Sequence, residues 1–73
     1  MADDNRERAR AELVATMLEK VKDDPYPSAT MLDLIEELLT PEETPEYVMF
    51  LQDRIRSDRF PSIPMLRRLT ALV

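Results

Sequence analysis

One stretch of the chain recurs with similar residues 34 positions further on, and this recurrence constrains the fold more than any other feature. Asp24–Leu32 reads D-P-Y-P-S-A-T-M-L, and Asp58–Leu66 reads D-R-F-P-S-I-P-M-L. In both copies an acidic residue precedes an aromatic ring, followed by Pro, Ser, two variable positions and the pair Met-Leu. Proline breaks a preceding helix, the Ser hydroxyl can cap the next one, and the ring can fold back on its first apolar residues. Each copy therefore predicts a helix end followed at once by a helix start.

The recurring stretch belongs to a longer internal repeat. Residues 10–39 overlay residues 44–73 without a gap when they are shifted by 34 positions. Nearly every apolar position in the first segment meets an apolar residue in the second, as Val14 meets Val48. This self-similarity predicts two copies of one supersecondary unit.

The sequence predicts a single all-α domain spanning residues 1–73. A chain of this length has a marginal hydrophobic core. We expect four short helices that form two pseudo-symmetric αα-hairpins, with repeat 1 at about 10–39 and repeat 2 at about 44–73. The hairpins would pack as a small bundle in which each covers the apolar stripe of the other. Residues 1–9 hold almost nothing apolar and are expected to be a polar N-terminal extension.

Apolar residues recur at helical spacing in four segments. The first helix is expected at Asp3–Asp23, the second opens at Ser28, the third begins at about Pro45, and the fourth opens at Ser62. Between the second and third, Thr40–Glu43 resembles a capping box with Pro in its first turn, which predicts one short turn. The residues expected to face inward are Leu13, Val14, Met17, Leu18 and Val21; Met31, Leu32, Leu34, Ile35, Leu38 and Leu39; Tyr47, Val48, Leu51 and Ile55; and Met65, Leu66, Leu69, Leu72 and Val73.

Two known helical families each share one feature with this chain, but the chain lacks the residue pattern that defines either family. A period of 34 residues is that of the tetratricopeptide repeat, yet the Trp, Gly and small-residue positions that define that repeat are missing. Acyl carrier proteins are small acidic four-helix proteins that need a Ser after Asp at the start of their second helix. Here Ser28 and Ser62 both follow prolines. The sequence therefore indicates neither family.

Composition excludes most catalytic and cofactor chemistry. The chain has no cysteine and no histidine, so it lacks disulfides, the usual zinc ligands and a general base that titrates near neutral pH. It has no glycine, which disfavours phosphate-binding loops. The paired carboxylates at 36–37 and 42–43 would point about 100° apart on a helix and could not share a ligand. We therefore expect no enzymatic activity, no cofactor, no metal and no small-molecule substrate.

Nothing in the sequence predicts a membrane segment or a targeting signal. Apolar residues make up 44% of the chain and charged residues 34%, as in ordinary folded soluble proteins. No apolar run approaches the roughly 20 residues that span a bilayer, and the start M-A-D-D-N-R-E-R is unlike a secretory or mitochondrial leader. We therefore expect a cytoplasmic protein without a membrane partner.

Charge is distributed unevenly between the two halves. Residues 1–43 hold five basic and twelve acidic side chains, a net charge of −7, whereas residues 44–73 hold five basic and three acidic, a net charge of +2. The contrast is sharpest where the repeat matches Asp33 with Arg67. In a second copy the acidic second helix could therefore meet the basic fourth helix, giving a two-fold dimer. The alternative is that these are ordinary solvated faces of a monomer.

Two residues of the third helix depart from the apolar pattern of the repeat. Met49 and Phe50 stand where the first copy has Ala15 and Thr16, and they are expected to lie off the core face. Beside Arg54 they could form a contact patch. The candidate interaction residues are therefore Asp33, Leu34, Glu36, Glu37, Met49, Phe50, Arg54, Arg67 and Arg68.

The function that these features favour is protein–protein interaction. We expect a small non-enzymatic helical module, an adaptor, inhibitor or regulatory subunit, that self-associates as a homodimer. An acidic mimic that blocks a basic enzyme surface is one form of this hypothesis. The alternative is a helix-turn-helix-like nucleic-acid binder that uses the basic second repeat, with Arg67 and Arg68 on bases or phosphates. The acidic first half disfavours nucleic acid because it repels phosphates at long range.

Overall fold

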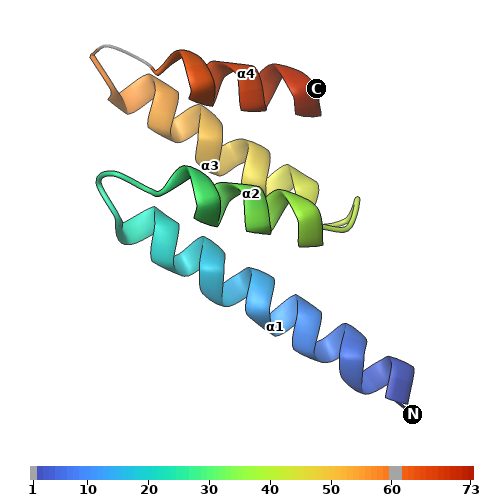
Figure 1. The fold of residues 1–73 in the computed structure, drawn as a ribbon. Coiled ribbons are helices and arrows are strands. Elements are labelled where there is room, and N and C mark those ends of the chain that lie inside the picture. Colours follow the sequence, from blue (N-terminus) through green and yellow to red (C-terminus); the bar gives the residue numbers. More distant parts are fainter. Residues whose placement is uncertain (1, 60–61) are drawn as a thin grey trace. The chain divides into compact units, whose positions relative to one another are not determined.

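The part of the chain that the structure describes contains four α-helices and the segments that connect them. The computed structural model describes the backbone of residues 2–59 and 62–73, and the side chains from Asp4 onward within these ranges. No β-strand occurs in them, so the all-α prediction is confirmed. Within the same residues, no helix combines the length and the hydropathy needed to cross a membrane. The helices are α1 (Ala2–Asp23), α2 (Ala29–Leu38), α3 (Thr44–Ser57) and α4 (Ile63–Leu72) (Figure 1).

Serine side chains cap the starts of α2 and α4, as the repeated stretch predicts. The Ser28 Oγ accepts a hydrogen bond from the Met31 N–H at 3.0 Å. The Ser62 Oγ accepts one from the Met65 N–H at 3.4 Å. Each bond satisfies an N–H group of the first turn that has no partner within the helix.

The loop between α1 and α2 contains the predicted break. In it the Asp24 carboxylate accepts a hydrogen bond from the Tyr26 N–H at 2.9 Å. Tyr26 is 89% exposed, so the expectation that its ring folds back on the helix is wrong. The prolines on both sides restrict the backbone here, and in the resulting conformation the ring contacts solvent. Phe60 and Pro61, in the corresponding break before α4, lie outside the described residues.

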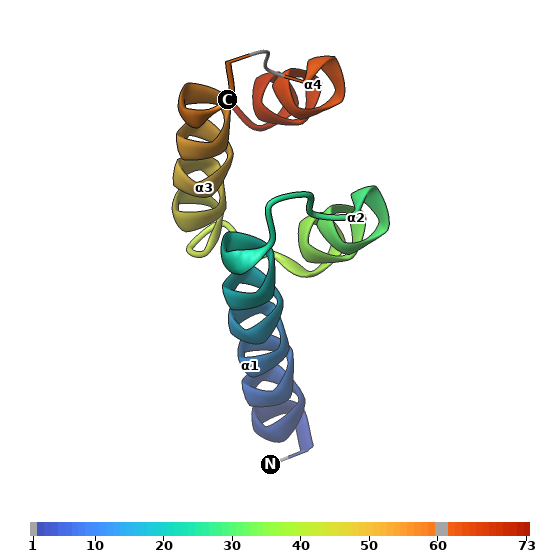
Figure 2. The same ribbon diagram turned by 90° about the vertical axis from the view of Figure 1, so that its left-hand side faces the viewer.

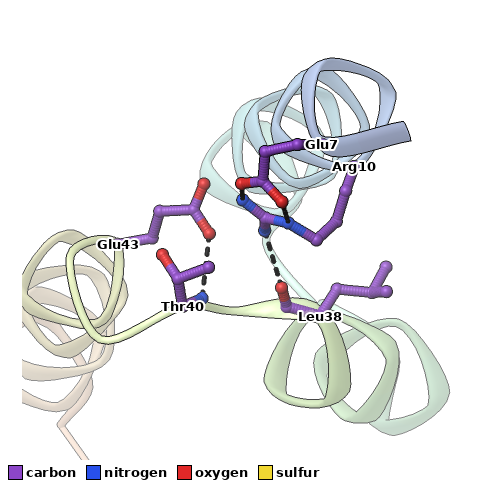
Figure 3. Close-up of polar contacts among 5 residues, drawn as sticks. All are labelled: Glu7, Arg10, Leu38, Thr40 and Glu43. Atoms are coloured by element: carbon purple, nitrogen blue, oxygen red, sulfur yellow. Dashed lines mark hydrogen bonds and ion pairs between the residues drawn. The ribbon is translucent and has the colours of Figure 1, made fainter. Parts of the chain in front are cut away.

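A single turn at residues 41–43 joins α2 to α3. The Thr40 N–H donates a hydrogen bond to the Glu43 Oε1 at 3.0 Å, which is the carboxylate half of the predicted capping box (Figure 3). The Thr44 hydroxyl donates to the Thr40 carbonyl oxygen at 3.0 Å. α3 begins at Thr44 and takes Pro45 into its first turn, where the missing N–H breaks no helical bond. The prediction of a short turn followed by a helix start near Pro45 is confirmed.

Successive helices pair into two helical hairpins. α1 packs against α2, and α3 packs against α4. The chain divides into two compact units, Met1–Leu39 and Thr40–Val73, and each contains one hairpin. Figure 2 shows the short second helix of each hairpin lying beside its longer first helix. The predicted pair of αα-hairpins is therefore observed.

The first hairpin has a core of six predicted residues. Two further residues were predicted to face inward and do not: Leu34 of α2 is 44% exposed, and Leu13 of α1 is 49% exposed. Leu13 lies about 90° around α1 from the centre of the buried stripe, because successive residues of a helix are about 100° apart. The buried core residues are Val14, Met17, Leu18 and Val21 of α1, with Leu32 and Ile35 of α2.

The second hairpin buries Tyr47, Phe50 and Leu51, all on α3. Phe50 is 5% exposed, so the prediction that it lies off the core face is wrong. It follows Tyr47 by three residues, which places both rings on one side of the helix. The two rings stack with their centroids 6.1 Å apart. Phe50 is therefore a core residue of this hairpin.

The fourth helix, in contrast, has no buried side chain. Its predicted inward residues Met65, Leu66, Leu69 and Leu72 are only half-buried. Val73 is 82% exposed, so its predicted inward position is wrong. It lies beyond Leu72, the last residue of α4, where the helical spacing no longer directs it toward α3.

The buried faces of α1 and α3 are not equivalent under the 34-residue shift. Thr16 is exposed whereas the corresponding Phe50 is buried, and Leu18 is buried whereas the corresponding Gln52 is exposed. The buried face of α3 is rotated by about one residue, or about 100°, relative to that of α1. Similar apolar patterns in the two first helices therefore do not give the same burial.

Candidate interaction surfaces

One side of α2 carries a partly exposed apolar strip. Met31, Leu34 and Leu38 follow the spacing i, i+3, i+7, which places them on the same side of the helix. Met31 and Leu38 are half-buried, and Leu34 is 44% exposed. We call these three residues the α2 flank.

The equivalent side of α4 is built in the same way. Met65, Arg68 and Leu72 have the same spacing, and all three are half-buried. Arg68 stands where the α2 flank has Leu34. Its aliphatic stem can pack among apolar neighbours while the guanidinium reaches water. We call these three residues the α4 flank.

α2 and α4 carry charges of opposite sign. On α2, Asp33 and Glu37 are exposed and Glu36 is half-buried, and the helix contains no basic residue. On α4, Arg67 is exposed beside the half-buried Arg68, and the helix contains no acidic residue. Both helices are ten residues long. The structure thus presents two helices of equal length and opposite charge, each with a partly exposed flank.

The predicted patch of Met49, Phe50 and Arg54 is not assembled. Met49 is 62% exposed, but Phe50 is buried. Arg54 is half-buried, and its guanidinium carbon lies 5.7 Å from the centroid of the Phe50 ring, within the range of a cation–π interaction. The sequence did contain a signal for this arrangement. Tyr47, Phe50 and Arg54 follow the spacing i, i+3, i+7, which puts two rings and a guanidinium on one face.

A contact that the sequence did not predict joins α1 to the end of α2. The Arg10 Nη1 donates a hydrogen bond to the Leu38 carbonyl oxygen at 2.7 Å (Figure 3). The Nη2 and Nε of the same guanidinium bind the two Glu7 carboxylate oxygens at 2.6 and 3.1 Å. Because carbonyl groups in the last turn of a helix have no helical partner, Arg10 caps the C-terminus of α2. The Glu7–Arg10 spacing indicates an ion pair, but only the hairpin brings Arg10 to Leu38.

No constellation suited to catalysis or metal binding stands out in the described parts of the chain. Among those residues, no group of three or more His, Cys, Asp or Glu side chains could hold a metal ion. An open hollow is lined by Glu19, Lys20 and Asp23, which are all exposed and all come from the end of α1. Among the described residues, its lining comes from one helix and offers no second element to orient a substrate.

Comparisons with protein-family models, with curated protein sequences and with solved structures each gave no match. Any function assigned to this chain therefore depends on its own residues.

Proposed function

We propose that this chain is a small non-enzymatic helical module that binds other proteins as an adaptor, inhibitor or regulatory subunit, and that it self-associates as a homodimer. The observation that carries the proposal is the incomplete burial of α4. Its sequence is mostly apolar, yet none of its side chains is buried. Because a short helix gains most of its stability in water from packing its apolar face, α4 needs a further surface against it.

The size and composition of the chain leave few ways to complete its core. At 73 residues a single core is marginal, and natural proteins of this size add disulfides, a metal or a partner chain. Cysteine and histidine are both absent, so disulfides and the usual zinc sites are excluded. Association with another chain is the remaining means of stabilisation.

The proposal includes a finer architecture. The two hairpins are copies of one 34-residue unit, with repeats at about 10–39 and 44–73, and they complete a small single-domain bundle. The matching caps of Ser28 and Ser62 support the repeat, while the rotated buried face of α3 is a departure within it. The α2 and α4 flanks are only partly buried within their own hairpins, so a protein partner can bind there.

Measurement of mass against concentration tests self-association. Sedimentation equilibrium between about 1 μM and about 1 mM covers the dissociation constants of weak and moderate complexes. We expect the mass to rise from one chain toward two, and Leu34→Ser to move this rise to higher concentration. A mass of one chain throughout would contradict self-association.

The alternative function is nucleic-acid binding, which exposed arginines on α3 and α4 would favour. Arg56 and Arg67 are both exposed. Electrophoretic retardation of duplex DNA and of single-stranded RNA at low salt tests it, because phosphate contacts are strongest there. We expect no retardation, since the first 43 residues repel phosphates. A shift that Arg67→Gln abolishes would favour the alternative instead.

A further inference from the structure

We draw no further inference here: the strongest candidate, the flank of α4 formed by Met65, Arg68 and Leu72, is only partly buried within its own hairpin, and nothing in the structure shows what covers it.

Discussion

The guanidinium carbon of Arg54 lies 5.7 Å from the centroid of the Phe50 ring, on the same face of α3 as Tyr47. The Tyr47 and Phe50 rings stack at an interplanar angle of 27°. Phe50 stands between the exposed Met49 and the buried Leu51, and it is 5% exposed. The three side chains form a compact aromatic and cationic cluster, which makes Phe50 part of the folded core rather than part of a contact surface.

Truncation of Phe50 should therefore destabilise the fold. We expect Phe50→Ala to lower the free energy of unfolding by about 3–5 kcal/mol, the usual cost of removing a buried aromatic ring. Urea unfolding followed by circular dichroism measures this loss. The neighbouring Met49→Ala is the control, because Met49 is 62% exposed and its substitution should cost less than about 0.5 kcal/mol. Equal, small effects of the two substitutions would show that Phe50 is not a core residue.

The contribution of Arg54 should depend on the ring. We expect a double-mutant cycle with Arg54→Met and Phe50→Leu to give a coupling free energy of about 0.5–1 kcal/mol, since Met keeps an apolar stem but no cation. The measurement is again urea unfolding. Arg56→Met serves as control, because Arg56 is exposed and only pairs loosely with Asp53 at 4.0 Å. Strict additivity of the Arg54 and Phe50 substitutions would rule out a direct interaction.

Removal of the serine caps should weaken both hairpins. We expect Ser28→Ala to cost about 1 kcal/mol of stability, and Ser62→Ala somewhat less because its hydrogen bond is longer, 3.4 Å against 3.0 Å. Thermal or urea unfolding measures both effects. Ser57→Ala is a matched control, since its hydroxyl bonds back to the Asp53 carbonyl within α3 and caps no helix start. If Ser57→Ala costs as much as Ser28→Ala, the loss does not come from capping.

Local chemistry is what the sequence predicts best in this protein. The starts of α2 and α4 and the turn before α3 depend on bonds between residues three positions apart, such as Ser28 with Met31 and Thr40 with Glu43. Their geometry is set within one helical turn, so residue types and spacing are sufficient. The same reasoning identified Val14 and Ile35 as core residues, because each stands at the centre of its apolar stripe.

Predictions at the edges of the stripes were less successful. Leu13 lies at the edge of the stripe drawn on α1, and Phe50 lies beside the stripe drawn on α3. A rotation of either helix by one residue changes which of its side chains at that edge are buried. Periodicity gives the width of an apolar face but does not give its direction within about 100°. The packing partner fixes that direction. The candidate patch around Phe50 failed for this reason. Met49 is exposed as expected, whereas Leu34, which was placed on the inward stripe as well as among the interaction residues, is 44% exposed.

The cap that Arg10 places on the end of α2 could not be predicted from the sequence, since Arg10 and Leu38 are 28 positions apart. We expect Arg10→Met to lower the free energy of unfolding by about 1–2 kcal/mol, because it removes a hydrogen bond from a charged donor to a carbonyl oxygen at 2.7 Å. Glu7→Gln weakens only the ion pair, whose carboxylate is 63% exposed, and should cost less than about 0.5 kcal/mol. Arg10→Lys should fall between them, since an ammonium cannot bind the carbonyl and the carboxylate with the same fork. Urea unfolding of the three variants decides the origin of the effect. Should Arg10→Met prove as mild as Glu7→Gln, the carbonyl contact contributes nothing measurable and the end of α2 depends on its apolar packing alone.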